Sequence, residues 1–196
     1  MNYATISADV ISYTSLLEEE RRRLETGIKE LLSDLTKKYE KHSFYGRLLQ
    51  GDYIECALKS PKYALRIALL LKTYIKTFDF NKKKGKRNRL KYFNEYGVRL
   101  AIAIAPLEKL DHVKGIIDGE AIYLSGRTIK NISTSNKQKI VIKNTLFFCT
   151  SDKKLQEQFD TFFSLIDTII SKCSAKQSEI IYYKLLDLSE KEISEK

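Results

Sequence analysis

Apolar side chains recur along the chain with two spacings, one typical of strands and one typical of helices. Residues 3–8 form a short run with β-branched members that stops at Asp9, which predicts a first strand. Apolar positions three, four or seven residues apart then predict a long helix, and Ser15 and Glu18 have the spacing of a capping box at its start. The apolar positions of this helix are Leu17, Leu24, Ile28, Leu31, Leu35 and Tyr39.

A hairpin and a second helix are predicted next. Residues 44–49 and 53–58 have strand-like patterns and are joined through Gln50, Gly51 and Asp52, where a glycine can adopt a positive φ. Ser60 followed by Pro61 is typical of a helix start. The apolar stripe of that helix consists of Ala64, Leu65, Ala68, Leu71 and Ile75.

The second half of the chain continues this alternation. Residues 98–105 are almost continuously apolar, which predicts a central strand covered on both faces. We expect a loop up to Asp118 and Gly119, a helix over residues 120–132, strands over 139–142 and 146–149, and a helix over 159–170.

The predicted order of elements is β-α-β-β-α-β, followed by α-β. The first six elements match the split-βαβ, or ferredoxin-like, arrangement. The sequence therefore predicts an α+β fold in which helices cover a sheet that contains antiparallel strands.

Composition limits the classes of protein to which the chain can belong. Its 196 residues are 43% hydrophobic, its mean hydropathy is −0.34, and it lacks an apolar run long enough for a transmembrane helix. A net charge of +10 favours a polyanionic partner or an anionic ligand. Cys56, Cys149 and Cys173 are too widely spaced for a zinc site, and they suit a reducing cytoplasm without disulfides.

Two carboxylates are the first candidates for chemistry. In a ferredoxin-like sheet the first and third strands are neighbours, so Asp9 at a strand end should lie beside Asp52 in the hairpin turn. Two adjacent carboxylates repel each other unless a cation lies between them, and Mg²⁺ accepts oxygen ligands of this kind. The alternative is that Asp9 caps a helix and Asp52 fills a turn.

Four short motifs, in this order and spacing, resemble those of class III nucleotidyl cyclase domains. Residues 8–16 resemble the segment after their first strand, and residues 48–53 resemble their hairpin with its second metal-binding aspartate. Residues 98–102 are similar to their central strand, and residues 118–127 are similar to the helix that ends in their transition-state arginine. The resemblance covers roughly residues 3–145.

The resemblance implies a site for a nucleoside triphosphate with Mg²⁺ or Mn²⁺. Asp9 and Asp52 would hold up to two cations, one of which activates the ribose hydroxyl while the other neutralises the triphosphate. Arg127 would stabilise charge on the α-phosphate, and Tyr123 would be its neighbour in the nucleotide site. In the family a second protomer completes the site, so the resemblance also implies a homodimer.

Three positions differ from the cyclase pattern. Tyr123 stands where the family has a ribose-orienting asparagine, Leu48 stands where a base-reading lysine is common, and Ala101 replaces a glycine. Arg47 is one residue before Leu48 and should point to the opposite face of its strand. The chain is also similar to the SatD-like bacterial family, which has the same Gly-Asp hairpin and a helix that ends in arginine.

The C-terminal segment resembles the opening of a helix-turn-helix. Ser174 is a plausible cap for a helix, and residues 185–193 follow it with a pattern like that of the second helix of such a motif. We expect the recognition helix itself to be missing, with DNA as the partner of a longer chain. The alternative is an amphipathic helix that packs on the body of the protein or on another protomer.

A basic segment separates the second helix from the central strand. Seven of the ten residues 82–91 are Lys or Arg. Six of these residues are candidates for contact with the phosphates of a nucleic acid. The alternative is a solvated loop, which is the commoner role of such a charge run. The candidate residues are Lys82, Lys83, Lys84, Lys86, Arg87 and Arg89.

These observations together predict three parts and one main function. The parts are a cyclase-like domain over residues 1–150, a connecting helix over 151–172, and a partial helix-turn-helix or terminal helices over 173–196. The leading hypothesis is a cytoplasmic regulatory protein that binds a nucleotide and a divalent metal, with no membrane partner. The alternatives are an active nucleotidyl cyclase and a catalytically inactive dimerisation module.

Overall fold

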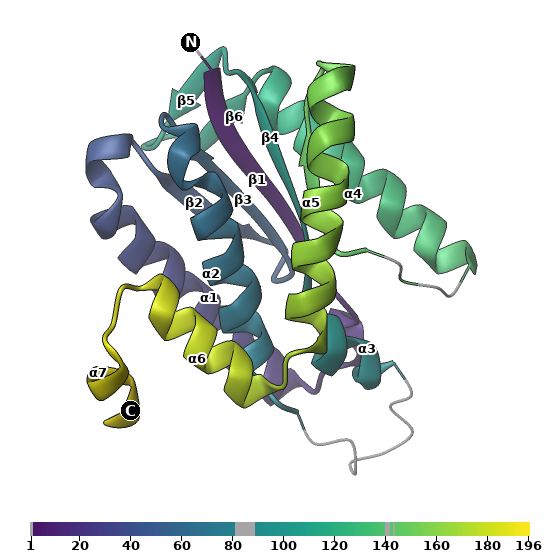
Figure 1. The fold of residues 1–196 in the computed structure, drawn as a ribbon. Coiled ribbons are helices and arrows are strands. Elements are labelled where there is room, and N and C mark those ends of the chain that lie inside the picture. The colour runs from purple at the N-terminus through teal and green to yellow at the C-terminus, as the bar shows by residue number, and fades with distance from the viewer. Residues whose placement is uncertain (1, 81–88, 140–141, 143) are drawn as a thin grey trace.

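A five-stranded sheet lies at the centre of the computed structural model, which describes residues 2–80, 89–139, 142 and 144–196 (Figure 1). The strands lie in the order β2-β3-β1-β4-β7, and all neighbours are antiparallel except β4 and β7. Their bounds are β1 (Asn2–Val10), β2 (Tyr45–Leu49), β3 (Tyr53–Leu58), β4 (Val98–Pro106) and β7 (Leu146–Cys149).

Two helices cover one face of the sheet and a third covers the other. Helices α1 (Glu18–Lys38) and α2 (Ala64–Thr77) pack on the first face, and α4 (Glu120–Lys139) packs on the second, against β1 and β4. The order β1-α1-β2-β3-α2-β4, with β1 between β3 and β4, is the ferredoxin-like arrangement. The predicted α+β fold is confirmed.

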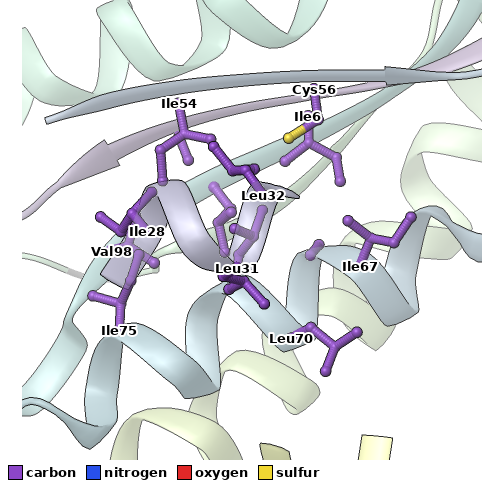
Figure 2. Close-up of a cluster of buried hydrophobic side chains, with 14 of the residues drawn as sticks. Ile6, Ile28, Leu31, Leu32, Ile54, Cys56, Ile67, Leu70, Ile75 and Val98 are labelled. Atoms are coloured by element: carbon purple, nitrogen blue, oxygen red, sulfur yellow. The ribbon is translucent and has the colours of Figure 1, made fainter. Parts of the chain in front are cut away.

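The alternation of side chains along the strands explains why both faces are covered. On β1, Ala4, Ile6 and Ala8 are fully buried toward α1 and α2. Thr5 and Ser7 point the other way, where both hydroxyls bond the hydroxyl of Ser125 on α4, at 3.2 and 2.8 Å. Figure 2 shows the first of these interfaces, with Ile54, Cys56 and Ile6 of the sheet above Leu31, Ile67 and Leu70 of the two helices.

The remaining elements extend the sheet's edge and surround the first layer. A small hairpin, β5 (Lys109–Asp111) and β6 (Ile116–Asp118), precedes α4, and α5 (Lys153–Lys172) packs on β7. Helix α6 (Ala175–Leu185) packs on α2, and α3 (Leu90–Tyr96) precedes β4. The short elements are η1 (Tyr13–Ser15), η2 (Glu40–His42), η3 (Pro61–Tyr63) and α7 (Glu190–Ser194).

Three local predictions need correction. Glu20 caps the start of α1, because its carboxylate accepts the Leu17 N–H at 2.8 Å. Ser15 belongs to η1 instead. The predicted capping box of Ser15 and Glu18 is therefore wrong. The loop expected before Asp118 contains the β5–β6 hairpin. Lys139, expected to begin a strand, ends α4, because that helix continues past Ile132 through a polar stretch without apolar periodicity. The next two residues of that predicted strand, Ile140 and Val141, lie outside the described residues.

A buried ion pair links α2 to α5. The Nζ of Lys72 lies 3.1 Å from Oδ1 of Asp167, and both side chains are almost completely buried. Lys72 also donates to Thr145 Oγ1 at 2.6 Å and to the Val98 carbonyl at 3.2 Å. Burial lowers the pKa of Lys72, and the carboxylate of Asp167 opposes that effect. The network joins α2 and α5 to the starts of β4 and β7.

Replacing one member of this pair should destabilise the fold. We expect Lys72→Met to lower the free energy of unfolding by about 3–5 kcal/mol, because it leaves the Asp167 carboxylate buried without a counter-charge. Adding Asp167→Asn should recover most of the loss. Urea denaturation of the three proteins measures both effects, and a single variant as stable as the original chain would contradict this account of the pair.

Candidate functional site

The end of β1 lies beside the turn of the β2–β3 hairpin. Asp9 is opposite Tyr53 of β3 and opposite Arg99 of β4 in the strand register. The next residue, Val10, donates its N–H to the carbonyl of Asp52 at 2.9 Å. The backbones of Asp9 and Asp52 are therefore adjacent at one end of the sheet, as the topology predicted.

An arginine that the sequence analysis did not single out pairs with Asp9. Arg99 Nη1 donates to Asp9 Oδ2 at 2.9 Å, and the side chain of Arg99 is 6% exposed while that of Asp9 is 23% exposed. The Nε of Arg99 is buried without a hydrogen-bond partner among the described residues. Burial lowers the pKa of Arg99, and the carboxylate of Asp9 opposes it. In the sequence, the only sign of this ion pair was that Arg99 is the single charged residue in an otherwise apolar strand.

The face of the sheet that carries Asp9 also carries Ser7 and Tyr53. Burial raises the pKa of Tyr53, the hydroxyl of Ser7 acts in the opposite direction, and the negative charges of Glu55 and Asp9 add to the increase. Alternation along the strands places these side chains on the face that α4 covers. Asp9 is thus a partly exposed carboxylate at the rim of a polar face.

A tyrosine and a glutamate that follow β1 pack against the hairpin turn. The hydroxyl of Tyr13 donates to Glu25 of α1, and burial together with that bond raises the pKa of Tyr13 to about 12. Gly51 has a φ of 84°, and a Cβ at this position would clash with the Tyr13 hydroxyl and lie 2.9 Å from Glu25 Oε1. The positive φ favours glycine, and the ends of these two side chains would have to shift to admit a larger residue.

Tyr123 and Arg127 lie on the outer side of α4. Tyr123 is 48% exposed and its hydroxyl donates to Asp118, while the Arg127 guanidinium lies 5.8 Å from the centroid of the Tyr123 ring. Ser125, between them in sequence, faces the sheet. The structure therefore brings Tyr123 and Arg127 together but directs them away from the sheet face that carries Asp9 of the same chain.

The candidate base-reading position is apolar here. Leu48 packs against the core on the α1 side, whereas Arg47 lies on the other face and bonds Glu55 through Nε at 2.9 Å. The predicted opposite orientation of these two side chains is confirmed. Arg47 also donates to the carbonyl of Gly115, so it anchors the β5–β6 hairpin to β2.

The basic segment is mostly outside the described residues. Lys82, Lys83, Lys84, Lys86 and Arg87 belong to residues 81–88, of which the structure gives no description. Arg89 is described and is exposed immediately before α3.

The carboxylates at the rim fit one hard cation better than two. Asp9 and Asp52 offer oxygen ligands from adjacent segments, and Mg²⁺ typically uses one or two carboxylates with water or phosphate oxygens in its other positions. Over residues 2–80, 89–139, 142 and 144–196 there is no cluster of three or more His, Cys, Asp or Glu side chains suited to a metal. Arg99 already supplies one positive charge to Asp9.

The C-terminal segment forms two helices joined by a short turn. Capping boxes begin both helices, with Ser174 and Gln177 at α6 and with Ser189 and Glu192 at α7. The turn contains Asp187, which has a φ of 71° and bonds both terminal nitrogens of Arg66 on α2 at 2.9 Å. Helix α6 thus packs on the body of the protein.

No protein-family model matches the chain, and no curated protein matches it. Among solved structures, it is similar to a bacterial light-regulated adenylyl cyclase at 12% identity and a TM-score of 0.50, over 80% of each chain. A second structure of such a cyclase aligns at 13% identity and a TM-score of 0.49, over 76% of this chain and 43% of that one. The guanylyl cyclase Cya2 aligns at 12% identity and a TM-score of 0.42, over 74% and 80%. The first likeness shows a cyclase-type fold.

The described helices include none that is both long enough and apolar enough to cross a membrane.

The tight turn beside Asp52 provides a test of the site's architecture. We expect Gly51→Ala to destabilise the protein by about 1–3 kcal/mol, from the left-handed backbone and the clash with Tyr13. In a Tyr13→Phe background the same substitution should cost less, because the hydroxyl nearest to the new Cβ is gone. Urea denaturation of the four proteins separates the two contributions; equal costs in both backgrounds would show that the clash contributes nothing.

Proposed function

We propose that this chain is a cytoplasmic regulatory protein whose cyclase-like domain binds a nucleoside triphosphate, or a related nucleotide, together with Mg²⁺ or Mn²⁺. The observation that carries the proposal is the meeting of Asp9 and Asp52 at one partly exposed end of a sheet with a cyclase-type fold. Carboxylate pairs and phosphate oxygens are the ligands that such cations prefer.

Each residue of the rim has a role in this proposal. Asp9 and Asp52 would hold the cation, and a bound cation would neutralise part of the phosphate charge. Arg99 orients the Asp9 carboxylate, since it donates a hydrogen bond to it from a buried position. Tyr13 and Glu25 pack against the turn that carries Asp52. These groups bind and orient; none of them by itself completes a catalytic site.

A homodimer is part of the proposal. Tyr123 and Arg127 are exposed on the side of α4 that faces away from the sheet. This placement supports a site in which these two residues serve the nucleotide bound by a second copy. Arg127 would then contribute positive charge toward the phosphates, where a fixed cation has its largest effect.

A DNA-binding role for residues 173–196 is the regulatory part of the proposal. Two capped helices separated by a short turn support it. We retain the division into a cyclase-like domain over 1–150, a connecting helix over 151–172 and a terminal motif. Any DNA complex that uses this motif should weaken steeply as salt rises, because phosphate contacts release counterions.

The second candidate function is an active nucleotidyl cyclase. The presence of Asp9, Asp52 and Arg127 favours it, and Tyr123 and Leu48 at the nucleotide-reading positions favour binding without turnover. A catalytically inactive dimerisation module is the third candidate. The reaction products and the metal-dependent binding of nucleotide distinguish the three candidate functions.

Metal-dependent nucleotide binding should appear as a shift in the melting temperature. With Mn²⁺ and a nucleotide at a hundredfold excess over its Kd, we expect about 2.7 kcal/mol of added stability, or about 5–11 °C for a chain of this size. Asp52→Asn should remove the shift. Asp34→Asn, which changes an exposed carboxylate on α1, is the matched control and should retain it.

The outcome also separates the candidate functions. No metal-dependent shift with any of the four ribonucleoside triphosphates would contradict the proposal and leave the dimerisation module. A cyclic nucleotide detected by mass spectrometry in the original chain, and absent with Asp52→Asn, would establish the cyclase.

A further inference from the structure

The ion pair of Arg99 and Asp9 is arranged differently from the buried ion pair of Lys72 and Asp167. It lies at the end of β1, the strand between β3 and β4 (Figure 1). Its cation is the buried partner, since 6% of the Arg99 side chain is exposed while 23% of the Asp9 side chain is exposed. A cation that reaches Asp9 from solvent would therefore meet a carboxylate that has a positive charge behind it.

The Lys72–Asp167 pair shows how a purely structural pair is built in this chain. Both side chains are almost completely buried. Lys72 donates to Thr145 Oγ1 and to the Val98 carbonyl as well as pairing with Asp167. The Asp167 carboxylate accepts both the N–H and the hydroxyl of Thr145. The two charges are thus compensated inside the core, and this pair needs no ligand.

Arg99 is less completely satisfied than Lys72. Its Nη1 donates to Asp9 Oδ2 at 2.9 Å, but its Nε is buried without a hydrogen-bond partner among the described residues. A buried donor without a partner destabilises a fold, and such groups are rare in native proteins. The guanidinium also keeps its charge, because arginine is not deprotonated in proteins. The fold thus keeps a positive charge behind Asp9 although it lowers stability, which points to a role in the site.

The charges at the rim favour a metal–phosphate complex over the metal alone. Asp9 and Asp52 carry two negative charges and Arg99 carries one positive charge, so their formal sum is −1. A divalent cation bound there alone would leave an excess of positive charge, in a chain whose net charge is already +10. Phosphate oxygens are ligands for the same cation, and their negative charge would remove this excess.

We infer that Arg99 makes the binding of the cation and of the phosphates interdependent, so that the site favours a cation that carries phosphates over a free cation. The inference deepens the proposed function and rests on it for the Asp9–Asp52 site. The charge of Arg99 weakens binding of the metal alone and strengthens binding of the phosphates. Arg99 is thus a specificity-determining residue through its charge, besides orienting Asp9 through its hydrogen bond.

Variants that separate charge from hydrogen bonding test this role. Arg99→Gln keeps a donor for Asp9 and removes the charge, whereas Arg99→Lys keeps the charge. Electron paramagnetic resonance measures the Kd of Mn²⁺ alone, and fluorescence anisotropy measures the Kd of a labelled non-hydrolysable nucleoside triphosphate at saturating Mn²⁺. Arg99→Gln should bind Mn²⁺ alone about tenfold more tightly and the nucleotide about tenfold more weakly. Arg99→Lys should stay close to the original chain in both.

Arg66→Gln is the matched control. Arg66 also pairs with an aspartate, Asp187, but it belongs to α2, on the face of the sheet opposite to α4. The substitution removes the same charge from the chain, and it should leave both Kd values unchanged. Arg99→Met, which lacks both charge and donor, is a second neutral variant in case Arg99→Gln does not fold, and it should shift the two Kd values in the same opposite directions. Circular dichroism reports the folding of each variant.

The directions of the two changes distinguish this role from a purely structural one. A structural role would make the neutral variants weaken both ligands or neither. Any result other than tighter Mn²⁺ and weaker nucleotide in the folded neutral variants, or the same shifts in Arg66→Gln, would overturn the inference. Metal-dependent nucleotide binding by the original chain would still support the proposed function in that case. An original chain that binds no nucleotide with Mn²⁺ would contradict the proposed function as well.

Discussion

The pairing of β1 with β3 on one side and β4 on the other determines where the rest of the structure lies. Its register places Asp9 between Tyr53 and Arg99, and it brings Val10 against the turn that carries Asp52. A shift of one residue would turn every side chain of β1 to the opposite face. Ala4, Ile6 and Ala8 would then leave the core, and Thr5 and Ser7 would lose Ser125. The register of β1 therefore determines both the packing of the core and the position of the site.

Asp9 has a structural and a proposed functional role that depend on the same oxygen atoms. Arg99 is almost completely buried, and its pairing with Asp9 offsets the cost of placing a guanidinium beneath α4. The same carboxylate is the best candidate to hold a cation with Asp52. A cation bound there would lie close to Arg99, so the site must balance two positive charges. Phosphate oxygens are the ligands that would restore that balance, which is why we propose a nucleotide together with the metal.

The sequence was most informative where topology alone determines proximity. The order of strands and helices predicted the sheet, and the sheet predicted that Asp9 and Asp52 meet. Arg99 escaped notice because an apolar strand pattern does not show which face a single charge occupies. The outward direction of Arg127 depends on how α4 docks through Ser125, a contact 118 residues away from Ser7 in sequence. The sequence analysis missed three features because no distinctive sequence pattern marks them. They are the polar end of α4, the β5–β6 hairpin and the Glu20 cap.

The C-terminal helices show how one fold can combine several surfaces. Helix α6 was predicted either to open a helix-turn-helix or to pack on the body, and its packing on α2 is observed. Helix α5 buries one side and exposes a second apolar side. In the proposed homodimer the outer side of α4 serves the Asp9–Asp52 rim of the second copy, so ligand binding and association share these surfaces. DNA binding is a proposal about a different surface.

Electron paramagnetic resonance of Mn²⁺ tests the central claim most directly, because only the free aqueous ion gives the sharp signal. The original chain is titrated with Mn²⁺ in the presence of a non-hydrolysable nucleoside triphosphate. The account predicts that it removes close to one equivalent of free Mn²⁺ beyond what the nucleotide alone binds. Asp9→Asn and Asp52→Asn should each abolish this loss of signal. A signal that the protein leaves unchanged, or a loss that persists in both variants, would contradict the assignment of the metal and nucleotide site to Asp9 and Asp52.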